Sequence, residues 1–319
     1  MFHRILVPLD GSAFAESALP LALALGRRGD VELELATVHE PVPSFAYDEW
    51  EDAARSWSEG YLADVRTRVV EAGAGPVTAS VLSGRVSEAL ERHARGAGVD
   101  LTVMATHGRG AFSRAWLGSV ADAFLRHAPC PVLLVRPDQD KLDLSLERGL
   151  TRMVVPLDGT ELSESILDPA IALAEPFGAR ILLLRVVAYP IEIASPYLPH
   201  TVHMNQAIVE EAKASSATYL ETHAESLRER GMAVETDVLV DSQAGHGILQ
   251  ASEAWRADVI AMATHGRTGM ARTILGSAAD KVVRGAHGAV LVYRPDLERR
   301  GAPSDPRHVG DPPGREEEG

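Results

Sequence analysis

Two segments of this chain repeat each other, and this repeat constrains the possible fold more than any other feature of the sequence. The stretch Arg4–Ser12 (RILVPLDGS) returns at Arg152–Thr160 (RMVVPLDGT). A second block, Met104–Arg109 (MATHGR), returns at Met262–Arg267. Since the chain has 319 residues, each copy has the size of an ordinary domain. We therefore expect two copies of one domain, fused head to tail.

The two copies differ in length between the repeated blocks. The first block recurs after 148 residues and the second after 158, so the second copy carries ten extra residues. Val38 and Val186 end matching apolar runs and still keep the shorter spacing. The insertion is therefore expected in 188–206, a segment with several prolines that we interpret as a loop or lid, although an ordinary surface insertion has the same pattern.

Short apolar runs alternate with helical patterns in each copy. In the first copy the predicted strands are 5–9, 31–38, 78–82, 101–105 and 132–135. The predicted helices are 14–27, a segment around 61–69, 87–95 and 120–127. Strands that are separated by helices predict an α/β fold, with a five-stranded parallel sheet covered on both faces in each domain. The predicted division is 1–136 and 151–294 for the domains, 137–150 for a charged linker and 295–319 for a disordered tail.

Charge and composition restrict the partners and the compartment. The formal net charge is -14, and only three of the 31 basic residues are lysines, so no basic stripe indicates a nucleic-acid partner. We expect no membrane span, because the apolar runs are too short, and no signal peptide. Cys130 is the single cysteine, so a disulfide within the chain is excluded, and we interpret it as a buried structural thiol. These features favour a cytoplasmic protein.

The repeated blocks fall where an open parallel sheet binds its ligands, at the carboxyl ends of the strands. Asp10 and Asp158 follow the first strand of their copies, and Val38 and Val186 end the second. The Thr-His-Gly segment follows the fourth strand in each copy. We therefore expect one site in each copy, built from these three strand ends.

A glycine-rich loop leads from the fourth strand to a helix in both copies. It contains Gly108 and Gly110 and closes with Gly118 and Ser119 in the first copy. Glycines let the main chain approach a bulky anion, and a helix N-terminus offers unpaired amides, so phosphate is the expected guest. A structural alternative is a capping box, since Ser119 and Ser277 each precede an aspartate by three residues; the two roles are compatible.

Several catalytic patterns are absent from the sequence. A Gly-Lys-Ser/Thr segment does not occur, the Rossmann glycine fingerprint is incomplete, and Gly-x-Ser-x-Gly is missing. His107 and His265 supply one histidine per site without a nearby Cys or second His, so no metal site made by the protein alone is predicted, and Mg²⁺ held mainly by phosphates fits better. We expect binding without catalytic residues.

The chain resembles a tandem universal stress protein of the ATP-binding type. Members of that family carry Gly-x-x-Gly, nine residues and Gly-Ser/Thr after the fourth strand; here Ala105–Gly108 and Ala263–Gly266 are each followed by nine residues and Gly-Ser. The resemblance implies Rossmann-like (HUP-type) domains whose last strands pair across a two-fold, giving an internal pseudo-dimer; a further homodimer is compatible with it. In both copies alanine replaces the first glycine, which affects affinity if a positive φ is needed there.

The resemblance also implies the site residues. The aspartates would contact the nucleoside, the Val38 and Val186 main chain would recognise adenine, and the loops would bind ribose and phosphates, with Arg109 and Arg267 adding charge. In the first copy the residues are Asp10, Val38, Ala105, Thr106, His107, Gly108, Arg109, Gly110, Gly118, Ser119 and Val120. In the second copy they are Asp158, Val186, Ala263, Thr264, His265, Gly266, Arg267, Thr268, Gly276, Ser277 and Ala278.

The function that follows from this resemblance is adenine-nucleotide binding (ATP or AMP) by a stress-response sensor or regulator, with slow or no hydrolysis. One alternative is an interaction protein whose glycine loops are structural, and another is a true ATP hydrolase or kinase. The copies also differ before their third helix, where Ser83-Gly84-Arg85 is matched by Asp241-Ser242-Gln243. The additional carboxylate predicts weaker phosphate binding in the second copy.

Overall fold

A computed structural model describes residues 1–40, 48–106, 117–137, 142–145, 149–188, 201–264 and 276–295. The first half contains the strands β1 Arg4–Pro8, β2 Glu32–His39, β3 Val77–Ser83, β4 Leu101–Ala105 and β5 Val132–Val135. Its helices are α1 Ala13–Glu16, α2 Leu19–Gly26, α3 Asp48–Glu71, α4 Val86–Gly96 and α5 Ser119–Leu125. All five strands predicted for this half are therefore present.

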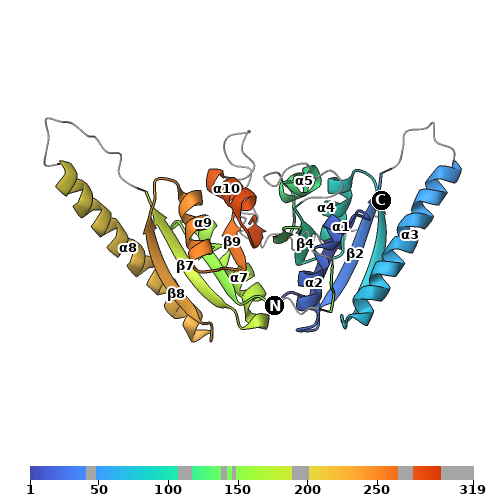
Figure 1. Ribbon diagram of the computed structural model, residues 1–319, viewed down its shortest axis with the longest axis horizontal. Coiled ribbons are helices and arrows are strands. Elements are labelled where there is room, and N and C mark those ends of the chain that lie inside the picture. Colours follow the sequence, from blue (N-terminus) through green and yellow to red (C-terminus); the bar gives the residue numbers. More distant parts are fainter. Residues whose placement is uncertain are drawn as a thin grey trace, which may run out of the picture.

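The second half repeats this order. Its strands are β6 Arg152–Pro156, β7 Arg180–Val187, β8 Val234–Val240, β9 Val259–Ala263 and β10 Ala289–Tyr293. Its helices are α6 Glu161–Glu164, α7 Leu167–Ala174, a short 3-10 helix Glu175–Phe177, α8 Thr201–Glu229, α9 Ala244–Ala254 and α10 Ser277–Gly285. The helices lie on both faces of the strands (Figure 1), which confirms the predicted α/β class.

One sheet of ten strands runs through both halves, in the order β3-β2-β1-β4-β5-β10-β9-β6-β7-β8. Pairing is parallel within each half, but β5 and β10 are antiparallel, with Leu133 opposite Leu291. This antiparallel join places the halves side by side with their outer helices α3 and α8 at opposite ends (Figure 1). The predicted internal pseudo-dimer is therefore confirmed, and its two sheets are continuous.

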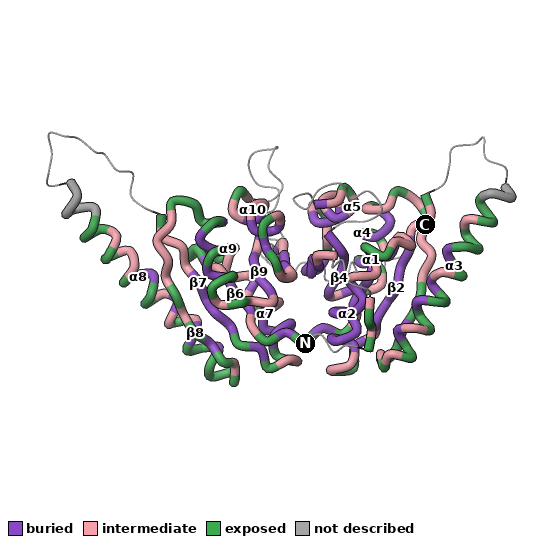
Figure 2. Tube along the Cα trace, viewed as in Figure 1, coloured by how far each residue is buried: buried purple, intermediate pink, exposed green. Residues whose placement is uncertain are grey.

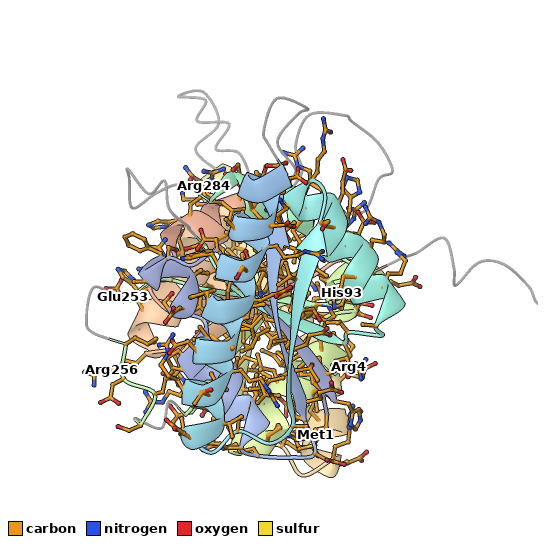
Figure 3. The ribbon with its side chains drawn as sticks, turned by 90° about the vertical axis from the view of Figure 1, so that its right-hand side faces the viewer. Met1, Arg4, His93, Glu253, Arg256 and Arg284 are labelled. Atoms are coloured by element: carbon orange, nitrogen blue, oxygen red, sulfur yellow. The ribbon has the colours of Figure 1, made fainter. Side chains whose placement is uncertain are left out.

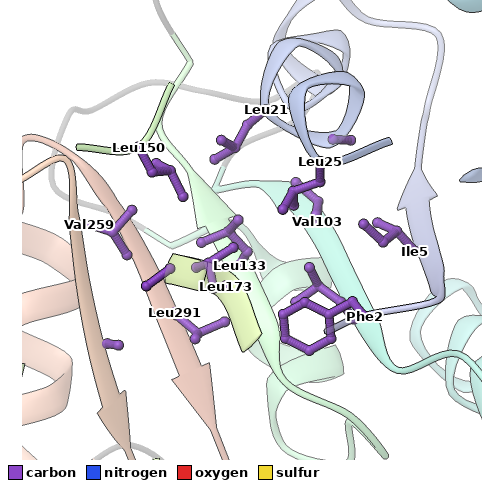
Figure 4. Packing of buried hydrophobic residues seen from close by; sticks show 14 of the residues in the cluster. Phe2, Ile5, Leu21, Leu25, Val103, Leu133, Leu150, Leu173, Val259 and Leu291 are labelled. Atoms are coloured by element: carbon purple, nitrogen blue, oxygen red, sulfur yellow. The ribbon is translucent and has the colours of Figure 1, made fainter. Parts of the chain in front are cut away.

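The apolar core also crosses the join. One cluster of buried side chains lies on the face covered by α2, α3, α7 and α8, and a second lies on the face covered by α4, α5, α9 and α10; each contains residues from both halves. Figure 4 shows Leu133 and Leu291 of the joined strands among residues of both halves. Buried residues follow the strands, whereas α3 and α8 carry many exposed residues (Figure 2). The halves are thus expected to unfold together.

Helix 14–27 of the prediction is in fact two helices, α1 and α2, which meet at Ser17 and Ala18. Proline explains the break. Pro20 lies in the first turn of α2 and has no amide hydrogen to donate to the carbonyl of Glu16, so a continuous helix would lose a hydrogen bond there. Pro169 lies at the third position of α7 and ends α6 for the same reason.

The ten extra residues of the second half lie after its second strand, as predicted. Part of the insertion lengthens the helix, because α8 has 29 residues and α3 has 24. The rest falls between β7 and α8, in a segment of which 189–200 lie outside the described residues, so its interpretation as a lid stays a prediction.

Cys130 is buried, and its Sγ lies 3.4 Å from the hydroxyl of Thr102. Burial raises the pKa of the thiol to about 11, so the thiol stays protonated at neutral pH. This environment is that of a structural cysteine. In the part of the chain that the structure describes, no helix is both long and apolar enough to cross a bilayer.

Candidate functional site

The turn after the first strand is built in the same way in both halves. The backbone amide and the hydroxyl of Ser12 both donate to Oδ1 of Asp10, at 2.9 and 2.6 Å. Thr160 makes the equivalent bonds to Asp158 at 3.0 and 2.6 Å. The residues between them, Gly11 and Gly159, have φ values of 79° and 85°, a region that favours glycine. The repeated Asp-Gly-Ser/Thr motif therefore fixes a carboxylate at the end of each first strand.

Asp158 is held in its ionised form. Burial is the largest influence and would raise the pKa of its carboxyl group, but hydrogen bonds from Thr160 and Ser163, together with the charge of Arg185, outweigh it. The pKa of Asp158 consequently lies below its ordinary value. An anionic group therefore stands at this strand end at neutral pH.

The end of the second strand presents main-chain groups rather than a side chain. The pairing of β1 with β2 ends at Pro8 and Ala36, and the last bond across the two strands runs from the Leu9 amide to the Ala36 carbonyl, at 2.8 Å. In a parallel sheet the N–H and C=O of a residue point to the same side, and this side alternates along the strand. The N–H and C=O of Val38 therefore point to the β1 side, beyond the last β1 residue.

Val186 has the same position in the second half. The Leu157 amide bonds the Leu184 carbonyl at 2.8 Å on the β6 side, and the Asp241 amide bonds the Val187 carbonyl at 3.0 Å on the other side. The alternation then directs the N–H and C=O of Val186 past the end of β6. Each half thus offers one donor and one acceptor, side by side, next to an aspartate turn.

Hydrogen bonds bring the two ends of the glycine loop together in the first half. The Thr106 amide donates to the Val135 carbonyl at 2.9 Å, and the Gly118 amide donates to the Thr106 carbonyl at 2.7 Å. In the second half the Thr264 amide donates to the Tyr293 carbonyl at 2.8 Å. The loop residues His107, Gly108, Arg109 and Gly110, and likewise His265, Gly266, Arg267 and Thr268, lie outside the described residues.

The capping box considered as a structural alternative is not formed. Helix α5 begins at Ser119 with Gly118 as its N-cap, α10 begins at Ser277 with Gly276 as its N-cap, and neither cap makes a side-chain hydrogen bond. The serines lie one residue too late to cap, because the preceding glycines Gly118 and Gly276 occupy the N-cap positions. Ser119 and Ser277 are exposed at the helix N-termini, followed by the partly buried Val120 and Ala278.

The aspartates of that pattern bond along their own helices. Asp122 accepts from Arg126 Nη2 at 2.6 Å, and Asp280 accepts from Arg284 Nε at 2.8 Å. The serine hydroxyls at the start of α5 and α10 are therefore not part of a reciprocal cap. Both first turns lie at the edge of the sheet where the strands end, at the top of Figure 1.

The second half carries additional polar and charged side chains around the start of α9, where its sequence differs from that of the first half. We call this group, Asp241, Gln243, His246 and Lys281, the rim. Nδ1 of His246 lies 2.6 Å from Oδ2 of Asp241, and Lys281 donates to Oε1 of Gln243 at 2.6 Å. The hydrogen bond with His246 is the largest influence that lowers the pKa of Asp241. This rim lies beside the strand end, because a Cβ on Gly247 would come within 3.0 Å of Val186 and 3.2 Å of Asp241. The cation Lys281 thus accompanies the extra carboxylate, and the expected effect of that carboxylate on phosphate binding stays a prediction.

Metal-binding side chains do not cluster among the described residues, where no group of three or more His, Cys, Asp or Glu is placed to hold an ion. His107 and His265 are outside that part of the chain. Of the predicted site residues, the structure places Asp10, Val38, Ala105, Thr106 and Gly118–Val120 at one edge of the sheet in the first half. Their counterparts Asp158, Val186, Ala263, Thr264 and Gly276–Ala278 occupy the same edge in the second half.

These features define a tandem α/β protein with one candidate site at the carboxyl edge of each half. The model of the universal stress protein family matches residues 1–136 and, a second time, residues 149–294. The chain therefore belongs to the universal stress protein family and contains two copies of its domain.

Similar proteins agree with this assignment. A universal stress protein of Thermus aquaticus is 35% identical over 137 residues, which are 43% of this chain and 100% of that protein. The crystal structure of a universal stress protein from Archaeoglobus fulgidus covers 91% of this chain and 98% of its own, with a TM-score of 0.68 and 20% identity. A putative universal stress protein from Pseudomonas aeruginosa covers 92% and 94%, with a TM-score of 0.59 and 17% identity. These two structures establish the likeness of the whole tandem fold.

Proposed function

We propose that the chain binds adenine nucleotide, ATP or AMP, at the carboxyl edge of each half and acts as a stress-response sensor or regulator with little or no hydrolysis. The observation that carries this proposal is the pair of main-chain groups on Val38 and on Val186. An adenine ring presents a donor, its amino group, beside an acceptor nitrogen, and this edge complements one C=O and one N–H. The neighbouring carboxylate of Asp10 or Asp158 would accept hydrogen bonds from the nucleoside.

In this proposal the phosphates bind at the end of each site that lies away from the second strand, at the N-terminus of α5 or α10. The N-termini of α5 and α10 carry exposed serines and follow a glycine-rich segment, and this combination favours an anion. Micromolar affinity corresponds to about 8 kcal/mol, of which a helix terminus contributes at most about 2 kcal/mol. Burial and hydrogen bonding of the base must therefore supply much of the remainder. Mg²⁺ would be held mainly by the phosphates.

A pair of substitutions at the second strand tests the base contact. Val38→Pro removes the donor that faces the site and leaves the bonds of Thr37 and His39 to β3 intact, because those residues point to the opposite side. Val38→Ala keeps the donor and is the matched control. With protein stripped of nucleotide, calorimetry should find about two ATP or AMP sites in the wild type and one in Val38→Pro, while Val38→Ala keeps both.

The same experiment on Val186 reports on the second site. Thermal unfolding of each variant shows that lost binding is not lost folding. The proposal fails if the wild-type protein binds neither ATP nor AMP, or if both proline variants bind as the wild type does.

The alternative function is that of an interaction protein whose glycine loops are structural. A substitution at Gly118 distinguishes this function from nucleotide binding. Its φ of -60° and ψ of 148° are open to any residue, so Gly118→Leu should retain the fold. A nucleotide sensor should lose the first site in this variant, whereas an interaction protein with empty pockets should show no nucleotide-dependent difference. A hydrolase would release phosphate well above the rate of Gly118→Leu; we expect no such excess.

A further inference from the structure

Arg185 makes the second site different from the first. It lies in β7, directly before Val186, and its guanidinium packs against the turn that carries Asp158. A Cβ on Gly159 would lie only 2.9 Å from Nη1 and 3.1 Å from Nη2 of Arg185. The cation therefore stands beside the predicted nucleoside end of the site. The anion-binding N-terminus of α10 lies elsewhere, after β9.

The aromatic ring of Tyr219 holds this guanidinium in place. The Arg185 guanidinium carbon is 5.0 Å from the ring centroid, within the range of a cation–π contact. The ring itself is fixed, because the Tyr219 hydroxyl donates to Oε1 of Glu164 at 2.8 Å. Arg185 is therefore positioned by the protein before any ligand binds, which lowers the entropy lost on binding.

Among the described residues, the Arg185 guanidinium makes no hydrogen bond and no ion pair within 4.0 Å, and its charge acts on the nearby Asp158 carboxyl group. A guanidinium carries five donors in a planar fork that matches a phosphate. Arg185 is half-buried, so its donors remain accessible at the end of the strand, and an anionic ligand would pair with two of them at once. The arrangement is that of a preformed anion contact.

The first half keeps the frame of this contact without its cation. Tyr61 there donates to Oε1 of Glu16 at 3.0 Å, as Tyr219 does to Glu164. The residue that corresponds to Arg185 by strand register is Thr37, which is buried. The neighbouring cation is Arg68, whose Nη1 already pairs with Glu16 at 3.0 Å. Among the described residues, a guanidinium that makes no ion pair within 4.0 Å therefore stands beside the aspartate turn in the second half and has no equivalent at position 37.

We propose that Arg185 gives the second site a preference for an adenine nucleotide that carries an additional phosphate on its ribose. This inference rests on the proposed function, because it assumes that the ribose lies near Asp158 and the 5′-phosphates near α10. In dinucleotide-binding folds an arginine beside the ribose-binding acidic residue accommodates a ribose phosphate in the same manner. The first site, with Thr37, would bind AMP and the bisphosphate alike.

Calorimetry with AMP, adenosine 3′,5′-bisphosphate and adenosine 2′,5′-bisphosphate tests this preference on the stripped full-length chain. In the wild type, one of the two sites should bind one bisphosphate at least about tenfold more tightly than AMP. Arg185→Thr, which installs the residue of the first half, should abolish this ratio and leave the affinity for AMP within about twofold. Arg185→Lys should keep part of the preference for the bisphosphate, because a lysine retains the positive charge but not the planar set of donors of a guanidinium.

Arg180→Thr is the matched control, since Arg180 lies in the same strand but is exposed and pairs with Glu235 at the opposite end; both affinities should stay unchanged. AMP binding without any bisphosphate preference in the wild type would overturn this inference and leave the proposed function standing. A preference for the bisphosphate that persists in Arg185→Thr would also overturn this inference and leave the proposed function standing. Tighter binding of GMP than AMP, lost in Arg185→Thr, would assign the fork to the base and overturn the ribose assignment. Absence of all nucleotide binding would overturn both proposals.

Discussion

The two halves share a fold but place their polar side chains differently. The first half buries a polar group within its core: Glu34 of β2 accepts from Ser80 at 3.0 Å and lies 2.6 Å from Nε2 of His93 on α4, the residue labelled in Figure 3. By register and helix position, Leu182 and Ala251 take the places of Glu34 and His93 in the second half. The second half is apolar at that point.

Polar groups concentrate at the carboxyl edge of the sheet in the second half. Arg185 and the pair Asp241–His246 have no counterpart of the same kind in the first. Both arrangements fit one backbone, because the consecutive buried apolar side chains of the central strands are retained in each half. The comparison teaches that the repeated apolar pattern sets the fold, while polar positions diverge between the copies.

The largest effect should come from the join, where each half contributes a fully buried leucine. Leu133→Ala and Leu291→Ala each remove a fully buried side chain from the paired strands and should each lower the free energy of unfolding by about 2–5 kcal/mol. Because the core crosses the join, urea unfolding should remain a single transition for both variants. Exposed Val70→Ala is the control and should change stability by about 0.5 kcal/mol or less. Two separate transitions would show that the halves are energetically independent.

The buried pair of the first half gives the next effect. His93→Ala leaves the Glu34 carboxylate with Ser80 alone and should lower the free energy of unfolding by about 1–3 kcal/mol. Adding Glu34→Leu recreates the Leu–Ala pair of the second half and should recover most of the loss, since apolar replacement of a buried pair is often neutral. A double variant that is less stable than His93→Ala in urea unfolding would contradict the equivalence of the two cores.

Cys130 and Gly288 occupy equivalent positions before the last strand of each half, and their substitution by alanine should differ. A Cβ on Gly288 would lie 2.3 Å from the Asp258 carbonyl oxygen, so Gly288→Ala must displace the backbone and should lower the free energy of unfolding by about 1–3 kcal/mol. Cys130→Ala only removes a buried sulfur and should lower it by about 1 kcal/mol or less. Equal thermal shifts for the two variants would refute this asymmetry.

The smallest expected effect is the pH dependence contributed by Asp158. Its pKa is lowered in the folded protein, so its ionised form stabilises the fold above the ordinary aspartate pKa of about 3.9. This contribution is lost as the pH falls through the lower, folded pKa. The stability difference between the wild type and Asp158→Asn should therefore be constant above about pH 5 and shrink towards pH 3. Urea unfolding at several pH values measures it, and a difference that does not vary with pH would contradict the shift.

Much of the fold was predictable because it depends on the apolar pattern. The strands that contain Val38 and Ala105, and the place of Asp10 after the first strand, follow from periodicity and the repeat. Geometry within one turn was harder to predict. A Ser-x-x-Asp pattern does not reveal that Gly118 takes the cap, and an apolar helical run hides the break that Pro20 introduces.

Arg185 was overlooked for a different reason. A single charged residue inside the run RILLLRVV has no local signature, and its neighbours Gly159 and Tyr219 are distant in the sequence. Setting the two copies side by side supplies the signal, since threonine stands at that position in the first. The middle of each glycine loop lies outside the described residues, so its part in the site rests on the resemblance.

The antiparallel pairing of β5 with β10 has a consequence for how such a protein diverges. In a dimer of identical chains every substitution appears twice, so neither site can change alone. Here β5 of one half pairs with β10 of the other half of the same chain, at a high effective concentration set by the linker, and the ratio of the two halves is fixed at one to one. The chain encoded by such a duplicated gene is the equivalent of a heterodimer within one polypeptide. One half can therefore acquire a new specificity while the other half keeps the old one.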